Sequence, residues 1–190
     1  MFEDLLIRLG EALNRRGFPY MIIGGQAVLL YGEPRLTRDI DITLGADTDR
    51  FDDLASLSQE IGLTLLPQDP LKFVNETMVL PSLEQSTGIR VDFIFSFSPY
   101  EYQAIQRARK ILFGAQSVQF AAPEDVIIHK IIAGRPRDLE DVRIILLKNP
   151  RVDTGYIRKW LKEFSSVSEE ADFSETFSKL QGSLPYKETN

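Results

Sequence analysis

The chain contains no cysteine, and among its 190 residues there are only one histidine and one tryptophan. The absence of cysteine excludes disulfides, thiolate nucleophiles and cysteine-based zinc sites, and it suits a reducing cytoplasm. The single histidine, His129, precedes Lys130 in an apolar helical pattern. Because no Ser-His-Asp arrangement surrounds it, a packing or surface role is favoured over that of a catalytic base.

Long hydrophobic runs are also missing, and none approaches the ~20 apolar residues that a helix needs to cross a bilayer. The segment from Met1 to Gly17 starts with acidic residues and lacks the basic and apolar regions of a signal peptide. We therefore expect a cytoplasmic protein with no membrane partner. Basic residues number 22 against 28 acidic ones. This balance disfavours broad coating of nucleic acid, while leaving open the binding of one RNA end through a local patch.

Apolar residues make up 43% of the chain and aromatic residues 10%, which is the range of folded soluble proteins. The length fits one globular domain, or a compact catalytic domain with a helical extension. We place the boundary near Ala121. The expected parts are a catalytic core over 1–121, a helical region over 122–182 and a tail over 183–190.

The spacing of apolar residues, with glycine and proline as breaks, predicts the order of helices and strands. The expected helices run from Phe2 to just before Gly17, then over 26–31, 49–61, 99–109, 123–133, 138–147, 154–164 and 169–180. The expected strands cover 20–23, 39–44, 63–66, 73–79, 89–95 and 117–120. This pattern predicts an α/β fold, in which a small twisted mixed sheet is flanked by helices and a C-terminal helical cluster closes a cleft.

Asp39 and Asp41 are the first candidates for chemistry, because alternate residues of a strand point the same way about 6.6 to 6.8 Å apart. Two unpaired carboxylates at this spacing repel each other, and a divalent cation such as magnesium is their natural counter-charge. The alternative is a solvated edge strand whose acidic residues serve solubility.

Gly24 and Gly25 stand between an expected strand and a short helix. Without side chains there, a phosphate can approach the backbone N–H groups and the helix N-terminus. The alternative is a tight strand-to-helix turn with no ligand.

Asp92 lies in the otherwise apolar expected strand 89–95, opposite its main apolar row. A third acid near bound metal can act as a ligand and accept the proton of an attacking hydroxyl. The alternative is an edge-strand aspartate paired with Arg90 or Arg35.

The run from Gly24 to Tyr31, followed by Arg35 to Asp41 and by Asp92 on a later strand, resembles the DNA polymerase β-like nucleotidyltransferase superfamily. Within it the sequence is most similar to the nucleotidyltransferase-like toxins of type IV abortive-infection systems and their uncharacterised relatives. The resemblance implies two magnesium ions held by three catalytic carboxylates, Asp39, Asp41 and Asp92. It also implies that the phosphates are bound by Gly24, Gly25, Thr37, Arg38 and Lys130.

The resemblance extends to the helical half, where His129-Lys130 is followed by the stretch from Arg137 to Asp141. It implies that Lys130 neutralises a triphosphate and that Asp138 and Asp141 orient Lys130 or the substrate. The alternative is a solvated, salt-bridged helix face. One departure is that many members carry Gly-Ser at the glycine pair, where the serine hydroxyl helps to hold the phosphates. Triphosphate affinity here would then be weaker, or would rely more on Thr37, Arg38 and Lys130.

The function implied is the transfer of a nucleoside monophosphate from a nucleoside triphosphate to a hydroxyl acceptor. The acceptor would be an RNA 3′ end such as that of tRNA, a protein or a small molecule, and a toxin-like member would pair with an antitoxin protein. Two other functions stay open. One is a catalytically degenerate binding or regulatory module, and the other is a small-molecule nucleotidyltransferase of the aminoglycoside type.

Overall fold

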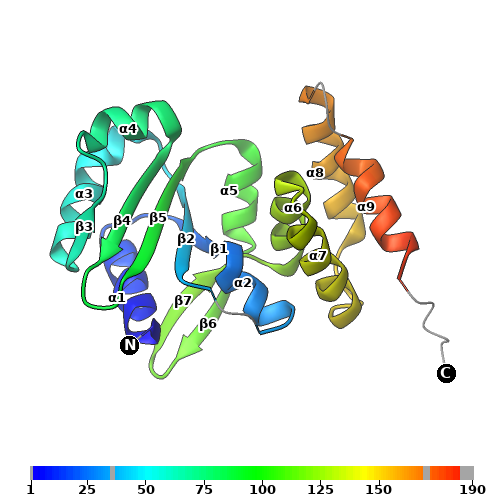
Figure 1. Cartoon of the computed structure of the whole chain (residues 1–190), viewed down its shortest axis with the longest axis horizontal. Coiled ribbons are helices and arrows are strands. Elements are labelled where there is room, and N and C mark those ends of the chain that lie inside the picture. The colour runs from blue at the N-terminus through cyan, green and yellow to red at the C-terminus, as the bar shows by residue number, and fades with distance from the viewer. Residues whose placement is uncertain (1, 35–36, 169–171, 185–190) are drawn as a thin grey trace. The chain divides into compact units, whose positions relative to one another are not determined.

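A computed structural model of the protein describes residues 2–34, 37–168 and 172–184 (Figure 1). Contacts between Cα atoms divide the chain into two compact units, residues 1–26 with 36–122 and residues 27–35 with 123–190. The division expected from sequence was contiguous, whereas the segment 27–35 joins the second unit.

Within the described residues, the first unit is built on a seven-stranded sheet with the order β3-β4-β5-β2-β1-β7-β6. The strands are β1 (Tyr20–Ile23), β2 (Asp39–Gly45), β3 (Leu63–Leu65), β4 (Val79–Glu84), β5 (Ile89–Ser96), β6 (Arg109–Phe113) and β7 (Gln116–Phe120). Strand β2 runs parallel to β5 and antiparallel to β1, and β1 runs parallel to β7. The predicted α/β fold with a mixed sheet is confirmed.

The helices of this unit are α1 (Phe2–Arg15), the 3-10 turn η1 (Thr48–Arg50), α3 (Phe51–Glu60), α4 (Pro70–Thr77) and α5 (Pro99–Gln106). Helix α1 buries a stripe at helical spacing, in which Leu5, Leu9 and Leu13 have no exposed surface. This burial follows the 3.6-residue period of the sequence and removes the stripe from water.

The two faces of the central strands differ in burial, as their alternation predicts. On one face of β2, Ile40, Ile42 and Leu44 are fully buried, as are Val91 and Phe93 on β5. The opposite face carries the acidic residues of the same strands, so the core on one side fixes the direction in which the carboxylates point.

The strand expected over 73–79 is wrong, because helix α4 (Pro70–Thr77) occupies most of this segment. The Asp69 side chain caps the helix by accepting a hydrogen bond from the Lys72 N–H, and Pro70 stands in its first turn. Met78 ends it with a left-handed backbone, φ 61°. Strand β4 follows and contains Pro81, so this proline lies within a strand rather than at a break between elements.

The helix expected over 99–109 ends at Gln106, and β6 (Arg109–Phe113) was not predicted. Strand β6 forms an antiparallel hairpin with β7 and lies at the edge of the sheet. Its side chains are largely exposed, so the strand lacks the apolar alternation by which a half-buried strand is recognised.

Helix α2 (Gly24–Tyr31) starts in the first unit and ends in the second. The second unit further contains α6 (Pro123–Ala133), α7 (Pro136–Lys148), α8 (Thr154–Val167) and α9 (Phe173–Gly182), all near their expected positions. Residues 169–171 of the last expected helix and 185–190 of the expected tail lie outside the described residues. No helix in the described part of the chain is long and apolar enough to span a membrane.

Candidate functional site

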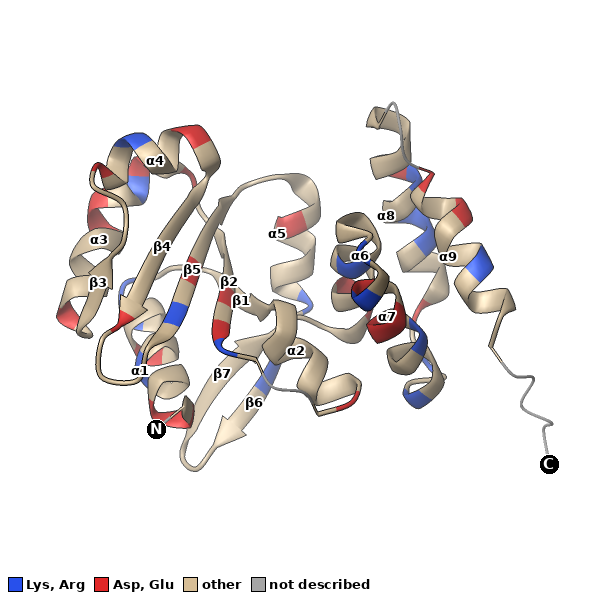
Figure 2. Cartoon of the chain, viewed as in Figure 1, with Lys and Arg blue, Asp and Glu red and all other residues tan. Residues whose placement is uncertain are grey.

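Two adjacent parallel strands bring the three predicted catalytic carboxylates onto one face of the sheet. In the register of β2 and β5, Asp41 is paired with Asp92, and Asp39 lies two residues before Asp41 on the same side. Neighbouring strands lie about 4.8 Å apart, so the carboxylates of Asp41 and Asp92 start from adjacent backbone positions. Figure 2 shows acidic positions on both strands. We call this surface of β2 and β5 the carboxylate face.

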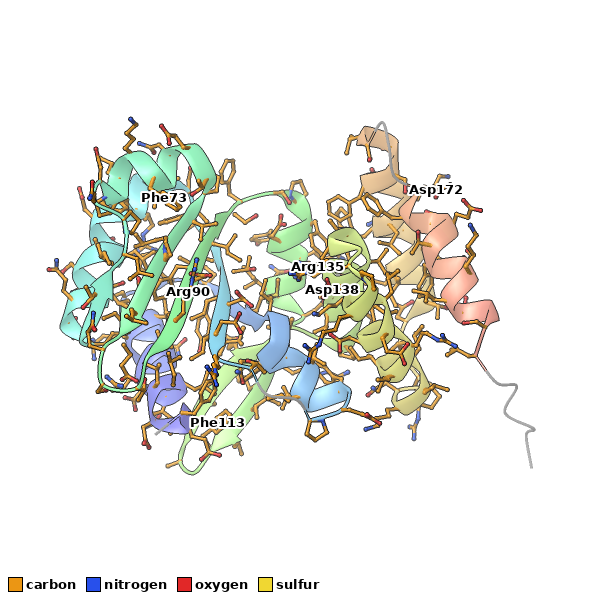
Figure 3. The ribbon with its side chains drawn as sticks, in the orientation of Figure 1. Phe73, Arg90, Phe113, Arg135, Asp138 and Asp172 are labelled. Carbon is orange, nitrogen blue, oxygen red and sulfur yellow. The ribbon has the colours of Figure 1, made fainter. Side chains whose placement is uncertain are left out.

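Arg90 belongs to the same face, because the register pairs it with Asp39. Figure 3 labels Arg90. Its Nε donates a hydrogen bond of 2.7 Å to Asp92 Oδ1. This bond raises the pKa of Arg90, with some opposition from burial and further support from the charges of Asp41 and Asp39. Of the two partners that the sequence left open for Asp92, the structure shows Arg90, while Arg35 lies outside the described residues.

Gly24 is the first residue of α2 and lies directly against Asp41. A Cβ atom at this position would overlap the Asp41 carboxylate, and the backbone adopts φ +65°, which residues with side chains rarely take. The glycine therefore allows the Asp41 carboxylate to approach the start of the helix, where N–H groups and the helix dipole favour negative charge.

Gly25 lies against Thr37, whose Cβ, Cγ2 and Oγ1 atoms would be 3.0, 3.1 and 3.2 Å from a Cβ at this position. The Thr37 hydroxyl accepts a 2.5 Å hydrogen bond from Gln26 Nε2 and donates to the Asp39 carbonyl at 3.2 Å. Gln26 Nε2 also donates to that carbonyl at 3.3 Å. The predicted phosphate-binding residues Gly25 and Thr37 are thus in contact beside Asp39.

Gln26 has a structural role that was not predicted from the sequence. Its side chain is 5% exposed and links the first turn of α2 to the start of β2. The only signal was its place directly after the glycine pair. Arg38, a predicted phosphate ligand, is exposed. The backbone carbonyl of Arg38 accepts a 3.3 Å hydrogen bond from the backbone N–H of Arg90.

The chemistry of the carboxylate face fits a hard divalent cation, because three aspartates supply oxygen donors from adjacent strand positions. The side chains are not gathered into a ligand shell as they stand. Across the part of the chain that the structure describes, no group of three histidine, cysteine, aspartate or glutamate side chains is close enough to hold a metal ion. Asp92 is bound to Arg90 instead, so a metal would require these side chains to rearrange.

In the second unit, Lys130 of α6 is 6% exposed and forms ion pairs with Asp138 at 2.5 Å and Asp141 at 3.0 Å. Arg135 Nε also donates a 2.5 Å hydrogen bond to Asp138 (Figure 3). We call these four residues the Lys130 cluster. Lys130 contacts both aspartates, and these three residues are buried rather than spread over a solvated helix face, while Arg135 is exposed. The expectation that Asp138 and Asp141 orient Lys130 or the substrate stays a prediction. The role of Lys130 toward a triphosphate stays a prediction.

Opposing effects act on the pKa of Asp138. Burial raises it, but hydrogen bonds from Arg135 and Lys130, together with their charges, outweigh burial and leave the pKa below its usual value. Asp138 is therefore ionised at neutral pH and stabilises the second unit through its two cationic partners. Arg135 was not anticipated from the sequence.

The model of one protein family, "Nucleotidyltransferase of unknown function (DUF6036)", matches residues 4–188. The chain belongs to this nucleotidyltransferase family. The predicted superfamily is thereby confirmed. No curated protein matches the sequence.

Solved structures share the nucleotidyltransferase fold at low sequence identity. The antibiotic-resistance factor ANT(2'')-Ia in solution has a TM-score of 0.58 and 14% identity, over 95% of this chain and 96% of that chain. An antigenic nucleotidyltransferase-like protein from Paracoccidioides brasiliensis has a TM-score of 0.53 and 17% identity, over 95% and 92%. Lincomycin-bound lincosamide antibiotic adenylyltransferase LnuA has a TM-score of 0.52 and 14% identity, over 75% and 95%.

Proposed function

We propose that this member of the nucleotidyltransferase family transfers a nucleoside monophosphate from a nucleoside triphosphate to a hydroxyl acceptor. The observation that carries the proposal is the register of β2 and β5, which pairs Asp41 with Asp92 beside the start of α2. A solvated edge strand would not explain this arrangement, because β2 and β5 are interior strands of the sheet. Asp41 and Asp92 are thus held by interior strands of the sheet rather than at its edge.

Asp39, Asp41 and Asp92 would hold magnesium, in line with their oxygen donors and shared face. When bound, magnesium would neutralise phosphate charge and so favour displacement at phosphorus. The expectation from the superfamily is two ions.

The chain's own groups would bind the nucleotide and move the proton. The N–H groups at Gly24 and Gly25 would contact the phosphates at the start of α2, with the Thr37 hydroxyl and the exposed Arg38 beside them. Asp92 would accept the proton of the acceptor hydroxyl. The oxygen of that hydroxyl would attack the α-phosphorus in line, and pyrophosphate would leave. These roles follow from the superfamily pattern and the placement of the residues.

The acceptor class separates the possible biological roles. An RNA end or a protein acceptor would fit the toxin-like resemblance, and a small hydroxylated compound would fit an enzyme of the aminoglycoside type. ANT(2'')-Ia has been crystallised in complex with adenylyl-2''-tobramycin, a small molecule. A degenerate binding module would keep the fold and lose transfer.

The test combines calorimetry with a transfer assay. Each nucleoside triphosphate is titrated into the wild type with and without Mg²⁺, and α-labelled nucleotide is then supplied with total RNA, protein lysate or a panel of small alcohols. We expect nucleotide binding that requires Mg²⁺ and transfer of label to one acceptor class. Asp41→Asn should weaken Mg²⁺ binding by at least about tenfold, because it removes one anionic ligand.

Asp52→Asn is the matched control, since it removes one acidic charge from an exposed position on α3. It should bind and transfer like the wild type. If the wild type binds no nucleotide with Mg²⁺ and labels no acceptor, the proposal is wrong. Mg²⁺-dependent binding without transfer to any acceptor would favour the degenerate module.

A further inference from the structure

The strand register fixes the position of Arg90 on the carboxylate face in the same way as those of the three aspartates. It is the register partner of Asp39 and lies two residues before Asp92 on β5, so the backbone directs all four side chains to the carboxylate face. A guanidinium at this position is therefore built into a face that otherwise presents only negative charge from these two strands.

The two members of the Arg90–Asp92 pair differ in their freedom to move. The Arg90 side chain is 52% exposed, whereas that of Asp92 is 19% exposed. Arginine has a long flexible stem and keeps its charge hydrated at the surface, so its guanidinium can turn into solvent at a small cost. Asp92 is held on an interior strand and can keep its place while its partner changes.

The hydrogen bond between Arg90 and Asp92 also occupies a carboxylate oxygen of Asp92 that a cation would need. Arg90 Nε is 2.7 Å from Asp92 Oδ1, so one of the two Asp92 oxygens is already bound to a positive group. A divalent ion close to this guanidinium would experience repulsion between like charges. Direct ligation through Oδ1 therefore competes with the bond from Arg90.

We propose that Arg90 is an exchangeable counter-ion of the carboxylate face: it binds Asp92 when no metal is present and is displaced from that carboxylate when a divalent cation enters. The inference rests on the proposed function, because it takes Asp92 as a metal ligand. Arg90 is thus a positioning residue. It limits repulsion among the three carboxylates without metal, and it lowers the affinity of the face for cations.

The experiment measures Mn²⁺ and Mg²⁺ binding by calorimetry, with the metal alone as probe, on wild type, Arg90→Gln and Arg90→Lys. We expect Arg90→Gln to bind on the order of tenfold more tightly, the effect of removing a unit charge about 6 Å from a divalent ion in a water-like dielectric. Arg90→Lys keeps the charge and should bind within about threefold of the wild type. A purely structural role for Arg90 would weaken binding in both variants.

Lys110→Gln is the matched control for net charge. Lys110 is exposed on β6, which lies three strands from β2 in the sheet and hence about 14 Å away. This variant should bind metal like the wild type. In EDTA, Arg90→Gln should melt about 2 to 4 °C below the wild type, because the three carboxylates lose the positive charge of Arg90. Saturating metal should remove that difference.

The outcomes separate this inference from the proposed function. If the wild type binds metal and Arg90→Gln binds it no more tightly, Arg90 is not exchanged and the inference is wrong while the proposed function stands. If the wild type and Arg90→Gln both fail to bind Mn²⁺ or Mg²⁺, the metal-dependent function fails and the exchange fails with it. The melting difference in EDTA then still shows whether Arg90 offsets the charge of the carboxylates.

Discussion

At the scale of single residues, the carboxylate face depends on the absence of a Cβ atom at Gly24. Asp41 reaches the start of α2 because Gly24 has no Cβ. Glycine also adopts the φ of +65° at this position without the strain that a residue with a side chain would have. The acid and the glycine therefore work as a pair, although they are separated in sequence. A substitution at either position should affect the other.

Gly24→Ala should reduce Mg²⁺-dependent nucleotide binding by more than about tenfold, because the new methyl group displaces the Asp41 carboxylate. The strained backbone should also lower the free energy of unfolding by about 1–3 kcal/mol. Calorimetry measures the first effect and urea denaturation the second.

Gly114→Ala is the matched control for backbone strain. Gly114 has φ +61°, and among the described residues a Cβ there meets open space. It should lose a similar amount of stability and keep nucleotide binding. Equal binding by Gly24→Ala and the wild type would show that Asp41 does not need its present position.

At the scale of elements, helix α1 packs on the sheet through a glycine in its middle. A Cβ on Gly10 would lie 2.9 Å from Tyr20 Oη and 3.2 Å from Val118 Cγ2, on strands β1 and β7. Tyr20 is fully buried, and its hydroxyl accepts a 3.3 Å hydrogen bond from the Gln119 N–H. The ring is therefore poorly able to move away.

Gly10→Ala tests whether packing or helix propensity dominates at this contact. Alanine favours the helix by about 1 kcal/mol over glycine, whereas overpacking a filled core costs about 1–3 kcal/mol. Because two buried side chains would both have to move, we expect a net loss of stability in thermal and urea denaturation.

Gly182→Ala, at the end of α9, faces open space among the described residues and should be neutral or stabilising. If Gly10→Ala were also stabilising, α1 would not pack as tightly on β7 as the structure indicates.

At the scale of the whole molecule, the Lys130 cluster places one ammonium and two carboxylates in the interior of the second unit. Breaking such a buried group is costly because it leaves uncompensated charge, and the lowered pKa of Asp138 means that the folded state favours its ionised form. The cluster therefore makes the stability of this unit depend on pH.

Asp138→Asn should lower the free energy of unfolding at pH 7 by on the order of 3 kcal/mol. The folded pKa of Asp138 lies below its ordinary value of 3.8. The stability that it contributes is therefore present above about pH 4 and is lost as pH falls through the lower folded pKa. The difference between wild type and variant should shrink below pH 4 in denaturation measured from pH 7 to pH 2.

Glu140→Gln on the same helix is the control, because Glu140 is exposed and its loss should change stability by less than about 0.5 kcal/mol. A difference between wild type and Asp138→Asn that stays constant down to pH 2 would contradict ionised Asp138 as the source of the stability.

The sequence by itself determined the features that depend on local period and local breaks. The two-residue period of β2 placed Asp39 and Asp41 on one face, and the 3.6-residue period of α1 identified its buried stripe. Glycine and proline marked most ends of the helices. The fold class followed from this order of elements, because such an order packs in few ways. Helix α4 was missed although Asp69-Pro70 is a local helix start, since the apolar run after it was read as a strand.

Only the tertiary structure decided which residues meet across the sheet. The register that pairs Asp41 with Asp92, and Asp39 with Arg90, joins strands about fifty residues apart in sequence. The alternation of apolar residues in β5 sets the face of Asp92 and Arg90. A shift of two residues would keep that face and pair Asp41 with Arg90 or Ile94 instead, and no local pattern excludes such a shift. The same holds for the contact of Gly24 with Asp41 and for the burial of Lys130 with its aspartates. The sequence supplied the charged groups, and long-range packing of the chain decided their partners.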